Sequence, residues 1–364
     1  MKKTIINAAI IAAIALAACS EPATSPVSSA VSIRAVRPTP PPSSNISVVS
    51  LGSLPYSVRR RSNDGIGLAL NDGVSRSTTR VVGATSYDVI DQHAMTWTEQ
   101  DGMSPLDFGA PVYGWAYAVS DNGIIAGSTS PGTGNRAFVA AATTAASYLP
   151  VPAGTTSSEA RGISADGQCI TGFAETAAGG FALLWRAGGF EVVGSGSAIA
   201  VSNDCLAVAG TNSDGAVVWR WNGSAWIAEP LPFVDAGRIY LNGRRASSEV
   251  NDLSPSGEYV AGARTDSLAT HPVVWHRVGG SWIATDLPGT GSLANGVDNI
   301  GRAVGAGPDG PLLWTSSSSG YTRQILPPLE RSNLGWASAI NELGQITGRS
   351  RTRKGSRAVL WTIN

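Results

Sequence analysis

The sequence predicts an all-β fold, a seven-bladed β-propeller of four-stranded antiparallel blades. Three observations lead to this prediction: a repeated pattern, strand-like alternation within each repeat, and complementary chain ends. The pattern is a small-residue strand, a polar turn ending in Gly, an apolar strand ending in Gly and an apolar strand ending in Trp. It is complete at 159–185 and 249–275. Repeats about 40–50 residues long bury their apolar faces only against one another, so they stack into arrays or rings.

Further copies of the pattern cover most of the chain. Shortened copies run over 197–219, 293–314 and 336–361, and degenerate ones over 66–97 and 115–140. A fourth strand follows a Gly-rich turn in most copies, as in GGFEVVG and GSWIATDLP. Apolar residues that alternate with polar ones, with Gly, Ser, Asn and Asp in between, are typical of antiparallel hairpins. Four-stranded units of this length arranged around an axis make a propeller.

The two ends of the repeat region complement each other. The last copy stops at 361–364 without a fourth strand, whereas 47–55 has the form of a fourth strand with no unit before it. If these segments pair, they complete a seventh blade and leave no open sheet edge. We therefore expect the N-terminal strand to close the ring.

The N-terminal segment predicts export to the cell envelope. Lys2 and Lys3 precede a short apolar run at 5–18, which is typical of a secretory signal peptide. The run ends in Leu-Ala-Ala-Cys, which resembles a bacterial lipoprotein cleavage site with lipid on Cys19. Ser20 then implies sorting to the outer membrane, with the protein facing the periplasm or the surface. We expect a signal peptide at 1–18, a Ser/Pro/Ala-rich tether at 19–45 and a single propeller domain at 46–364.

Several tripeptides and one turn carry a resemblance to a known family. His93-Ala94-Met95, Arg136-Ala137-Phe138 and Arg357-Ala358-Val359 are variants of one tripeptide, and INELGQITG at 340–348 is a turn motif. In these features the chain after residue 46 resembles the HAF family of extracellular bacterial repeats. Cys205 departs from the turn motif because Gly is usual there. The resemblance implies a secreted or surface propeller and points to no particular activity.

Composition limits the partners and leaves one disulfide question open. Lys and Arg together number 26, as do Asp and Glu, so the net charge is zero and nothing indicates a nucleic-acid partner. Cys169 and Cys205 lie in neighbouring repeats, and an oxidising compartment permits a bridge between them. Their positions within the repeats differ, so the Cα atoms could also be too far apart for a bond. Two small buried thiols are the alternative.

No arrangement of residues points to catalysis or to a cofactor. The chain has only three His residues, and no Ser, His and Asp set falls at equivalent loop ends. No His/Cys cluster has the spacing of metal ligands. The GxGxxG match at 305–310 lies in a predicted β-hairpin and opens no helix, so it does not indicate a dinucleotide site. We expect no catalytic residues, metal or cofactor. A glycan hydrolase or lyase using Glu159 and Glu249 remains an alternative.

The Trp residues fall into two groups. In six of the seven repeats a Trp closes the third strand, where a bulky aromatic residue is expected to pack between blades, and Ala140 takes this position in the remaining copy. The six are Trp97, Trp185, Trp219, Trp275, Trp314 and Trp361. Trp115 and Trp336 instead lie five residues before the turn residue of their first strands, Ser120 and Asn341. Because the first strand of a propeller blade is innermost, this position is expected to ring one mouth of the central channel.

Basic residues from both ends of the sequence are expected on that same face. Arg59, Arg60 and Arg61 follow the closing strand, and Arg349, Arg351, Arg353 and Lys354 belong to the second hairpin of the last repeat. The connection between blades and this hairpin share a face, so the two groups should converge near Trp115 and Trp336. A basic surface on a neutral protein favours anionic ligands, although a solvated loop set explains the same residues.

The sequence therefore predicts a lipid-anchored, monomeric binding or scaffold propeller rather than an enzyme. The expected ligand is an acidic glycan, an envelope polymer or a protein. A glycan hydrolase or lyase is one alternative, and a periplasmic assembly factor that uses the propeller rim is the other.

Overall fold

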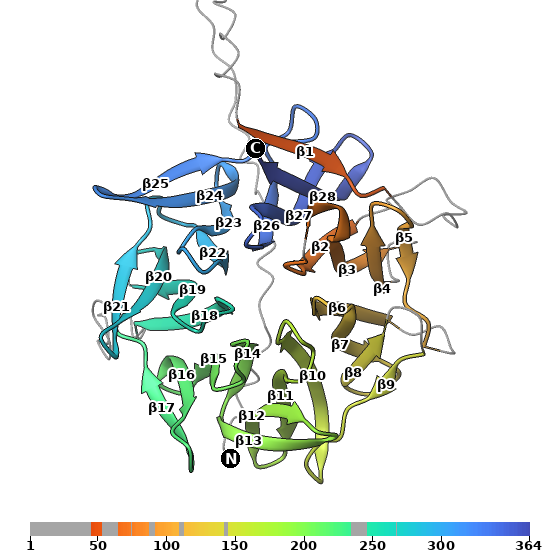
Figure 1. Ribbon diagram of the computed structural model, residues 1–364, viewed down its shortest axis with the longest axis vertical. Coiled ribbons are helices and arrows are strands. Elements are labelled where there is room, and N and C mark those ends of the chain that lie inside the picture. Colours follow the sequence, from red (N-terminus) through yellow and green to blue (C-terminus); the bar gives the residue numbers. More distant parts are fainter. Residues whose placement is uncertain are drawn as a thin grey trace, which may run out of the picture. The chain divides into compact units, whose positions relative to one another are not determined.

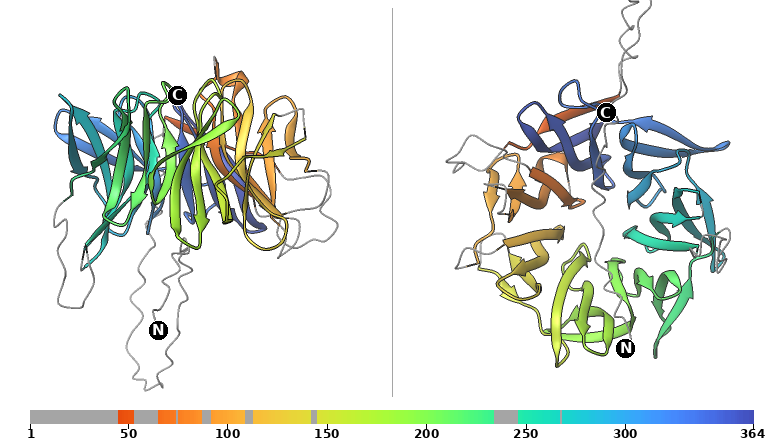
Figure 2. Two further views of the ribbon diagram at one scale, coloured as in Figure 1. Left: turned by 90° about the horizontal axis from the view of Figure 1, so that it is seen from below. Right: turned by 180° about the vertical axis from the view of Figure 1, so that it is seen from behind.

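The computed structural model describes residues 45–52, 65–73, 75–86, 92–108, 113–141, 145–233, 246–266 and 268–364. These residues form seven four-stranded antiparallel sheets around a central axis (Figure 1). The predicted seven-bladed β-propeller is confirmed. The described residues hold one short 3-10 helix, η1 (Arg76–Thr78), and none of their helices is long and apolar enough to span a membrane. In side view the sheets stand next to one another as a ring about one strand deep (Figure 2).

The blades are numbered in chain order. Blade 1 consists of β2 (Gly65–Leu70), β3 (Arg80–Ser86), β4 (Gln92–Thr98) and β5 (Gly102–Pro105), and blade 2 of β6 (Tyr113–Val119), β7 (Ile124–Ser130), β8 (Arg136–Ala141) and β9 (Ser147–Tyr148). Blade 3 consists of β10 (Thr155–Ile163), β11 (Ile170–Thr176), β12 (Gly179–Arg186) and β13 (Gly189–Ser195), and blade 4 of β14 (Ser197–Val201), β15 (Ala207–Asn212), β16 (Gly215–Trp221) and β17 (Trp226–Pro230). Blade 5 consists of β18 (Ser247–Leu253), β19 (Tyr259–Thr265), β20 (Thr270–Val278) and β21 (Ser281–Asp286), and blade 6 of β22 (Leu293–Val297), β23 (Ala303–Gly307), β24 (Gly310–Ser317) and β25 (Gly320–Ile325). Blade 7 consists of β26 (Gly335–Ile340), β27 (Gln345–Thr352), β28 (Gly355–Ile363) and β1 (Ile46–Ser50). In each blade the first strand of this order lies nearest the axis and the fourth is outermost (Figure 1).

The two ends of the repeat region meet in blade 7, which confirms the predicted closure. β1 pairs antiparallel with β28, from Ile46 opposite Ile363 to Ser50 opposite Val359. Ile46 is buried in the core of blade 7, and Leu51, just after β1, is buried in a cluster shared with blade 1. The N-terminal strand therefore supplies the fourth strand of the last blade.

The loops define two faces of the propeller. We call the side with the turns between first and second strands the turn face, and the side with the hairpins between second and third strands the hairpin face. A Gly with positive φ ends the first turn in five blades, at Gly123, Gly167, Gly257, Gly301 and Gly344. Cys205 takes this position in blade 4 with φ 60°, a backbone conformation that favours Gly.

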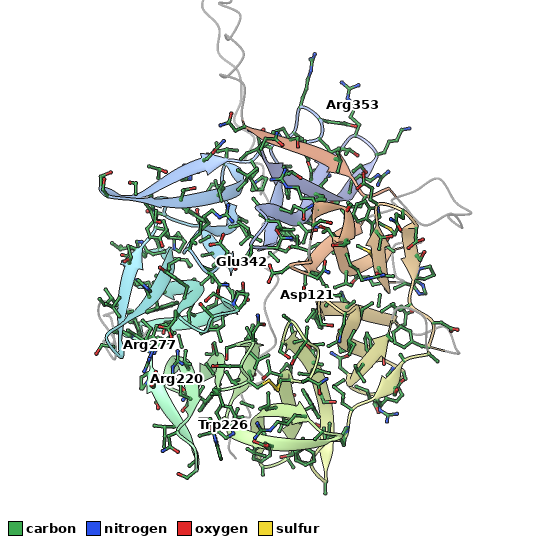
Figure 3. The ribbon with its side chains drawn as sticks, viewed as in Figure 1. Asp121, Arg220, Trp226, Arg277, Glu342 and Arg353 are labelled. Atoms are coloured by element: carbon green, nitrogen blue, oxygen red, sulfur yellow. A yellow bond between two sulfur atoms is a disulfide. The ribbon has the colours of Figure 1, made fainter. Side chains whose placement is uncertain are left out.

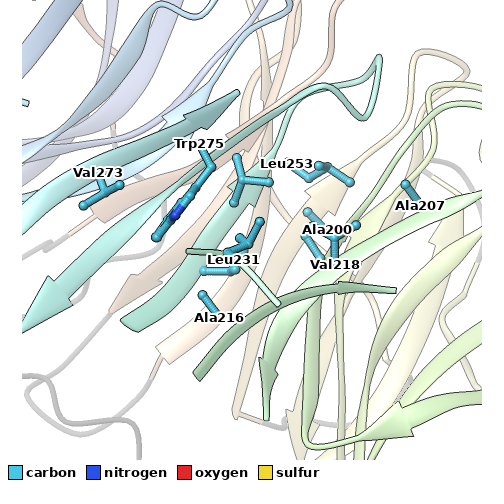
Figure 4. Close-up of a cluster of buried hydrophobic side chains, with 11 residues drawn as sticks. Ala200, Ala207, Ala216, Val218, Leu231, Leu253, Val273 and Trp275 are labelled. Carbon is cyan, nitrogen blue, oxygen red and sulfur yellow. The ribbon is translucent and has the colours of Figure 1, made fainter. Parts of the chain in front are cut away.

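The repeated Trp residues of six blades pack against neighbouring blades. Five of them expose 3% of their surface or less, namely Trp185, Trp219, Trp275, Trp314 and Trp361, whereas Trp97 is half-buried. Trp275 packs with Leu231 and Val218 of blade 4 (Figure 4). Its indole Nε1 donates a hydrogen bond of 2.6 Å to the Pro232 carbonyl, which follows the last strand of blade 4. The equivalent bonds are Trp185 to Pro150, Trp314 to Pro288 and Trp361 to Pro327.

Candidate functional site

Each first strand carries a β-bulge on the channel side. In blade 3 the register of β10 with β11 passes from Ala160 opposite Gly172 to Gly162 opposite Thr171 and so leaves out Arg161. A bulge leaves one residue out of the ladder and changes the direction of its side chain. The same skip recurs in all seven blades. The bulged residues are Leu68, Tyr117, Arg161, Ile199, Asn251, Asn295 and Ser338, and all of them line one cavity.

This channel cavity has a volume of about 190 Å³, and the residues that line it differ in polarity from blade to blade. Asn251 and Asn295 donate their side-chain Nδ2 groups to the Ala294 and Ala337 carbonyls of the following blades, at 2.9 and 2.8 Å. These bonds fix both amides and leave each with its carbonyl oxygen as an acceptor. Polar groups of this kind favour water or a small polar ligand over an apolar one.

Arg161 places a guanidinium group on the cavity wall that blades 2 and 3 form. Arg161 lies over the ring of Tyr117 at 4.1 Å from the centroid and contacts the Glu159 carboxylate at 2.5 Å. Asn135 Nδ2 also donates to Glu159, at 2.6 Å.

Glu249 belongs to blade 5, with one blade between it and Glu159, and burial raises the pKa of its carboxyl group.

A closed ring of hydrogen bonds joins the seven first turns at the turn face. Each bond runs from a backbone N–H of one turn to an oxygen of the next, and Figure 3 shows Asp121 and Glu342 of this ring near the axis. The bonds run from Asp72 to Asp121, Asp121 to Ala165, Ala165 to Asn203, Asn203 to Pro255, Ser256 to Asn299, Asn299 to Glu342 and Glu342 to Asp72, at 2.7–2.9 Å. The last bond spans the junction between blades 7 and 1, so this ring reinforces the closure made by β1.

Carboxylates concentrate at the turn-face end of the channel. Burial raises the pKa of Asp72, and the neighbouring carboxylates of Asp121 and Asp298 raise it further. Burial likewise raises the pKa of Glu342. Among the described residues, no group of three or more His, Cys, Asp or Glu side chains is arranged to hold a metal ion.

Asp252 is the most unusual residue of the channel. Burial raises the pKa of its carboxyl group to about 7, although it accepts a hydrogen bond of 2.9 Å from the Val297 N–H. It directly follows the bulged residue Asn251. The other blades carry only small residues at this position: Ala69, Ala118, Gly162, Ala200, Gly296 and Ala339.

The two predicted mouth residues, Trp115 and Trp336, lie outside the buried clusters formed by the described residues. Both are half-buried and lie two positions before a bulged residue, on the hairpin-face side. Arg349 pairs with Trp336 across the β26–β27 ladder, and its guanidinium carbon is 3.3 Å from the Trp336 ring centroid. The structure thus brings one predicted Trp and one predicted Arg into contact, while Trp115 lies on the other side of blade 1.

The remaining basic residues of blade 7 form a groove at the hairpin face. Arg351, Arg353 and Lys354 are exposed, and Figure 3 shows Arg353 projecting from the rim of blade 7. The Glu330 carboxylate accepts the Arg353 backbone N–H at 2.9 Å and so holds the hairpin to the connection from blade 6. The groove has a volume of about 560 Å³ and is lined by Glu330, Arg331, Ser332, Arg351, Thr352 and Arg353. We call these six residues the blade 7 groove.

Other predicted residues have different outcomes. Arg59, Arg60 and Arg61 lie outside the described residues, and so does Cys19. Cys169 and Cys205 form a disulfide that joins blades 3 and 4, with their Cα atoms 6.0 Å apart. Of the two alternatives that the sequence leaves open, the structure therefore has the bridge.

The bulged residues and Asp252 are not part of the site that the sequence predicts. A sequence signal for them exists, because most bulged residues stand between two small ones. Examples are Ala116-Tyr117-Ala118 and Ala337-Ser338-Ala339. Blade 5 is the exception, since Val250 and Asp252 flank its bulge.

Comparisons with known proteins support the architecture. No protein-family model matches the chain, and a search of curated proteins finds no match. A solved oligogalacturonate lyase in complex with manganese is 11% identical with a TM-score of 0.54, over 82% of this chain and 90% of that chain. A prolyl endopeptidase is 12% identical with a TM-score of 0.51, over 82% of this chain. At such identities these likenesses show the fold alone.

The chain is shorter than some of the proteins that it matches. It spans 50% of the prolyl endopeptidase. TolB from Acinetobacter baumannii is 13% identical with a TM-score of 0.46, and the match covers 68% of this chain and 64% of TolB.

Proposed function

We propose that this protein is a binding module that holds an acidic polymer in the blade 7 groove. The observation that carries this proposal is the composition of the groove, in which three guanidinium groups and one carboxylate line about 560 Å³ of open space. Guanidinium groups form paired hydrogen bonds with carboxylates, sulfates and phosphates. No ion pair within the described chain involves Arg331, Arg351 or Arg353, so these groups are available to a ligand.

The positive charge of the groove is local. The whole chain has equal numbers of basic and acidic residues. Electrostatic attraction is screened over roughly 8–10 Å at physiological ionic strength, so the nearest charges decide what binds. Lys354 on the same hairpin and Arg349, two residues before Arg351 on β27, add further basic side chains to blade 7.

We further propose that the groove faces away from the membrane. The described chain starts at Asn45, whose carbonyl accepts the backbone N–H of Asn364 at 2.7 Å, on the turn face. If Cys19 carries lipid, the anchor is joined to the propeller through Asn45 on that face. The groove on the opposite face then stays open to polymers of the envelope or the medium. The likeness to HAF repeats remains a prediction.

The anchor is tested separately from the groove. Cys19→Ala should shift the protein from the detergent phase to the aqueous phase, because lipid attachment needs the thiol. Membrane partitioning equal to that of the wild type would contradict lipidation.

Equilibrium binding of the full-length protein to alginate, a polyuronate, tests the groove. Arg353→Glu should weaken binding about tenfold or more, since it replaces an attraction by a repulsion. Arg136→Glu is the matched control. Arg136 is also exposed and on the hairpin face, but it stacks on Tyr148 of blade 2 at 3.8 Å. Equal losses for the two variants, or no binding by the wild type, would overturn the proposal.

A further inference from the structure

The hairpin-face mouth of the channel is divided into an apolar and a polar half. Each first strand contributes one residue to this ring, two positions before its bulge. Blades 6, 7, 1 and 2 contribute Leu293, Trp336, Ile66 and Trp115, and blades 3, 4 and 5 contribute Glu159, Ser197 and Glu249. We call these seven residues the mouth ring. Neighbouring blades follow the chain order, so each half is continuous.

The mouth ring lies next to the channel cavity along the first strands. The bulged residues, which line the cavity, stand two positions after the mouth-ring residues. Blade 3 shows the relationship directly, because Glu159 of the mouth ring contacts Arg161 of the cavity at 2.5 Å. A ligand group at the mouth would therefore have the polar floor of Asn251 and Asn295 beneath it.

The apolar half remains accessible. Leu293 exposes 37% of its surface, and Trp115, Trp336 and Ile66 are half-buried. Trp275, which closes a third strand, is by contrast fully buried between blades. Large aromatic side chains that stay open at a channel mouth contribute less to the core than to contacts with a ligand.

Glu249 is the exposed carboxylate of the mouth ring. Glu159 is buried and paired with Arg161, and the guanidinium group of Arg349 lies over the Trp336 ring. A flat apolar surface opposite a carboxylate acceptor suits a group with an apolar face and several hydroxyl donors. A pyranose ring has this chemistry, since its C–H groups stack on indoles and its hydroxyls donate to carboxylates.

We infer that the mouth ring binds a pyranose unit, stacked on the apolar half with a hydroxyl donated to the exposed carboxylate of Glu249. This inference rests on the proposed function and narrows the ligand of the blade 7 groove to an acidic glycan. The two sites are continuous along blade 7. Leu334 accepts the Arg351 backbone N–H at 2.8 Å beside the groove, and Trp336 follows two residues later. Two residues of extended chain span about 6–7 Å, so a polymer in the groove reaches the mouth directly.

Two probes separate the sites. Alginate oligosaccharide carries pyranose rings and carboxylates, whereas poly-L-glutamate of equal charge carries carboxylates alone. The full-length Trp115→Ala variant should bind alginate about fivefold more weakly and bind poly-L-glutamate within twofold of the wild type, since one stacking contact is lost. Trp115 is suited to this test because it lies two blades from the groove. Trp226→Ala is the control, because Trp226 is on the turn face and bonds Glu191.

A second pair of variants distinguishes the loss of ring stacking from misfolding. Trp336→Phe keeps a ring for stacking and should retain alginate binding, whereas Trp336→Leu should lose it with an unchanged melting temperature. If the Trp variants weaken both probes equally, or neither, the pyranose inference is overturned while groove binding stands. If the wild type binds poly-L-glutamate as tightly as alginate, the ligand is an acidic polypeptide and the inference is also overturned. Binding of neither probe by the wild type would overturn the proposed function as well.

Discussion

The disulfide between blades 3 and 4 allows a quantitative test of how the blades are held together. Cys169 and Cys205 are 36 residues apart in the sequence. In the chain-entropy account, closing a loop of this length lowers the entropy of the unfolded chain by about 13 cal/mol/K, which amounts to about 4 kcal/mol of stability at 25 °C. Reduction of the wild type should remove this contribution.

The backbone at Cys205 opposes part of this gain. Its φ of 60° lies in the left-handed region, where five other blades have Gly at the equivalent turn position. Holding a non-Gly residue there costs about 1 kcal/mol relative to Gly. The Cys205→Gly variant should therefore lose about 4 kcal/mol with the bridge, regain about 1 kcal/mol from the turn and end about 3 kcal/mol below the oxidised wild type. Cys169→Ala loses the bridge without this relief.

Urea unfolding with and without dithiothreitol, followed by Trp fluorescence, measures all three proteins. The reductant should destabilise only the wild type. Under reducing conditions the free energy of unfolding of Cys205→Gly should then exceed that of the reduced wild type by about 1 kcal/mol. A wild-type midpoint that does not move with reductant, or a Cys205→Gly variant less stable than the reduced wild type, would refute the reasoning.

Three further predictions concern the core, the channel and the closure. Trp275→Phe leaves the Pro232 carbonyl without its donor and should lower the free energy of unfolding by about 1–3 kcal/mol in urea titrations; a loss below about 0.5 kcal/mol would contradict the indole bond. The folded pKa of Asp252, about 7, exceeds its unfolded value, so the wild type should lose stability as pH rises from about 4 to 7. The free energy of unfolding of Asp252→Asn should therefore exceed that of the wild type above pH 7 and equal it below pH 4. A difference between the two free energies that does not change with pH would contradict this. Deleting 46–52 exposes two buried side chains and their cluster, costing about 3–5 kcal/mol, whereas deleting 20–40 should leave the melting temperature unchanged; equal melting temperatures would contradict closure.

The architecture could be predicted because each repeat carries its own strand and turn signals. One Trp at the end of the third strand marks the blade, and the incomplete last repeat at 336–361 calls for a strand from elsewhere. The positions of Trp115 and Trp336 followed from the same register. These features depend on order along the chain, which the sequence contains directly.

Contacts between blades could not be predicted in the same way. The turn-face ring uses side-chain acceptors at Asp121 and Asn203 but main-chain carbonyls at Ala165 and Pro255. Because a backbone oxygen can replace a side-chain one, no residue motif marks the ring. The disulfide depended on a Cα separation across two blades, which spacing along the chain does not determine.

The channel lining escaped prediction for a related reason. A bulge changes which residue faces the axis, so simple alternation assigns Arg161 and Asn251 to the wrong positions. Asp252 then stands where other blades have Ala or Gly, and its burial appears only when the ring is closed. The small residues on either side of most bulges are the local signal that identifies the lining.

Amide hydrogen exchange of the full-length protein with and without alginate tests the central claim most directly. Binding in the blade 7 groove should slow exchange in the connection at 330–334 and in the hairpin at 351–355, where backbone amides lie beside the bound polymer. Exchange at the turn-face positions 121–123 and 203–205 should not change. Protection confined to the turn face, or no protection at 351–355 under saturating alginate, would contradict binding at the blade 7 groove.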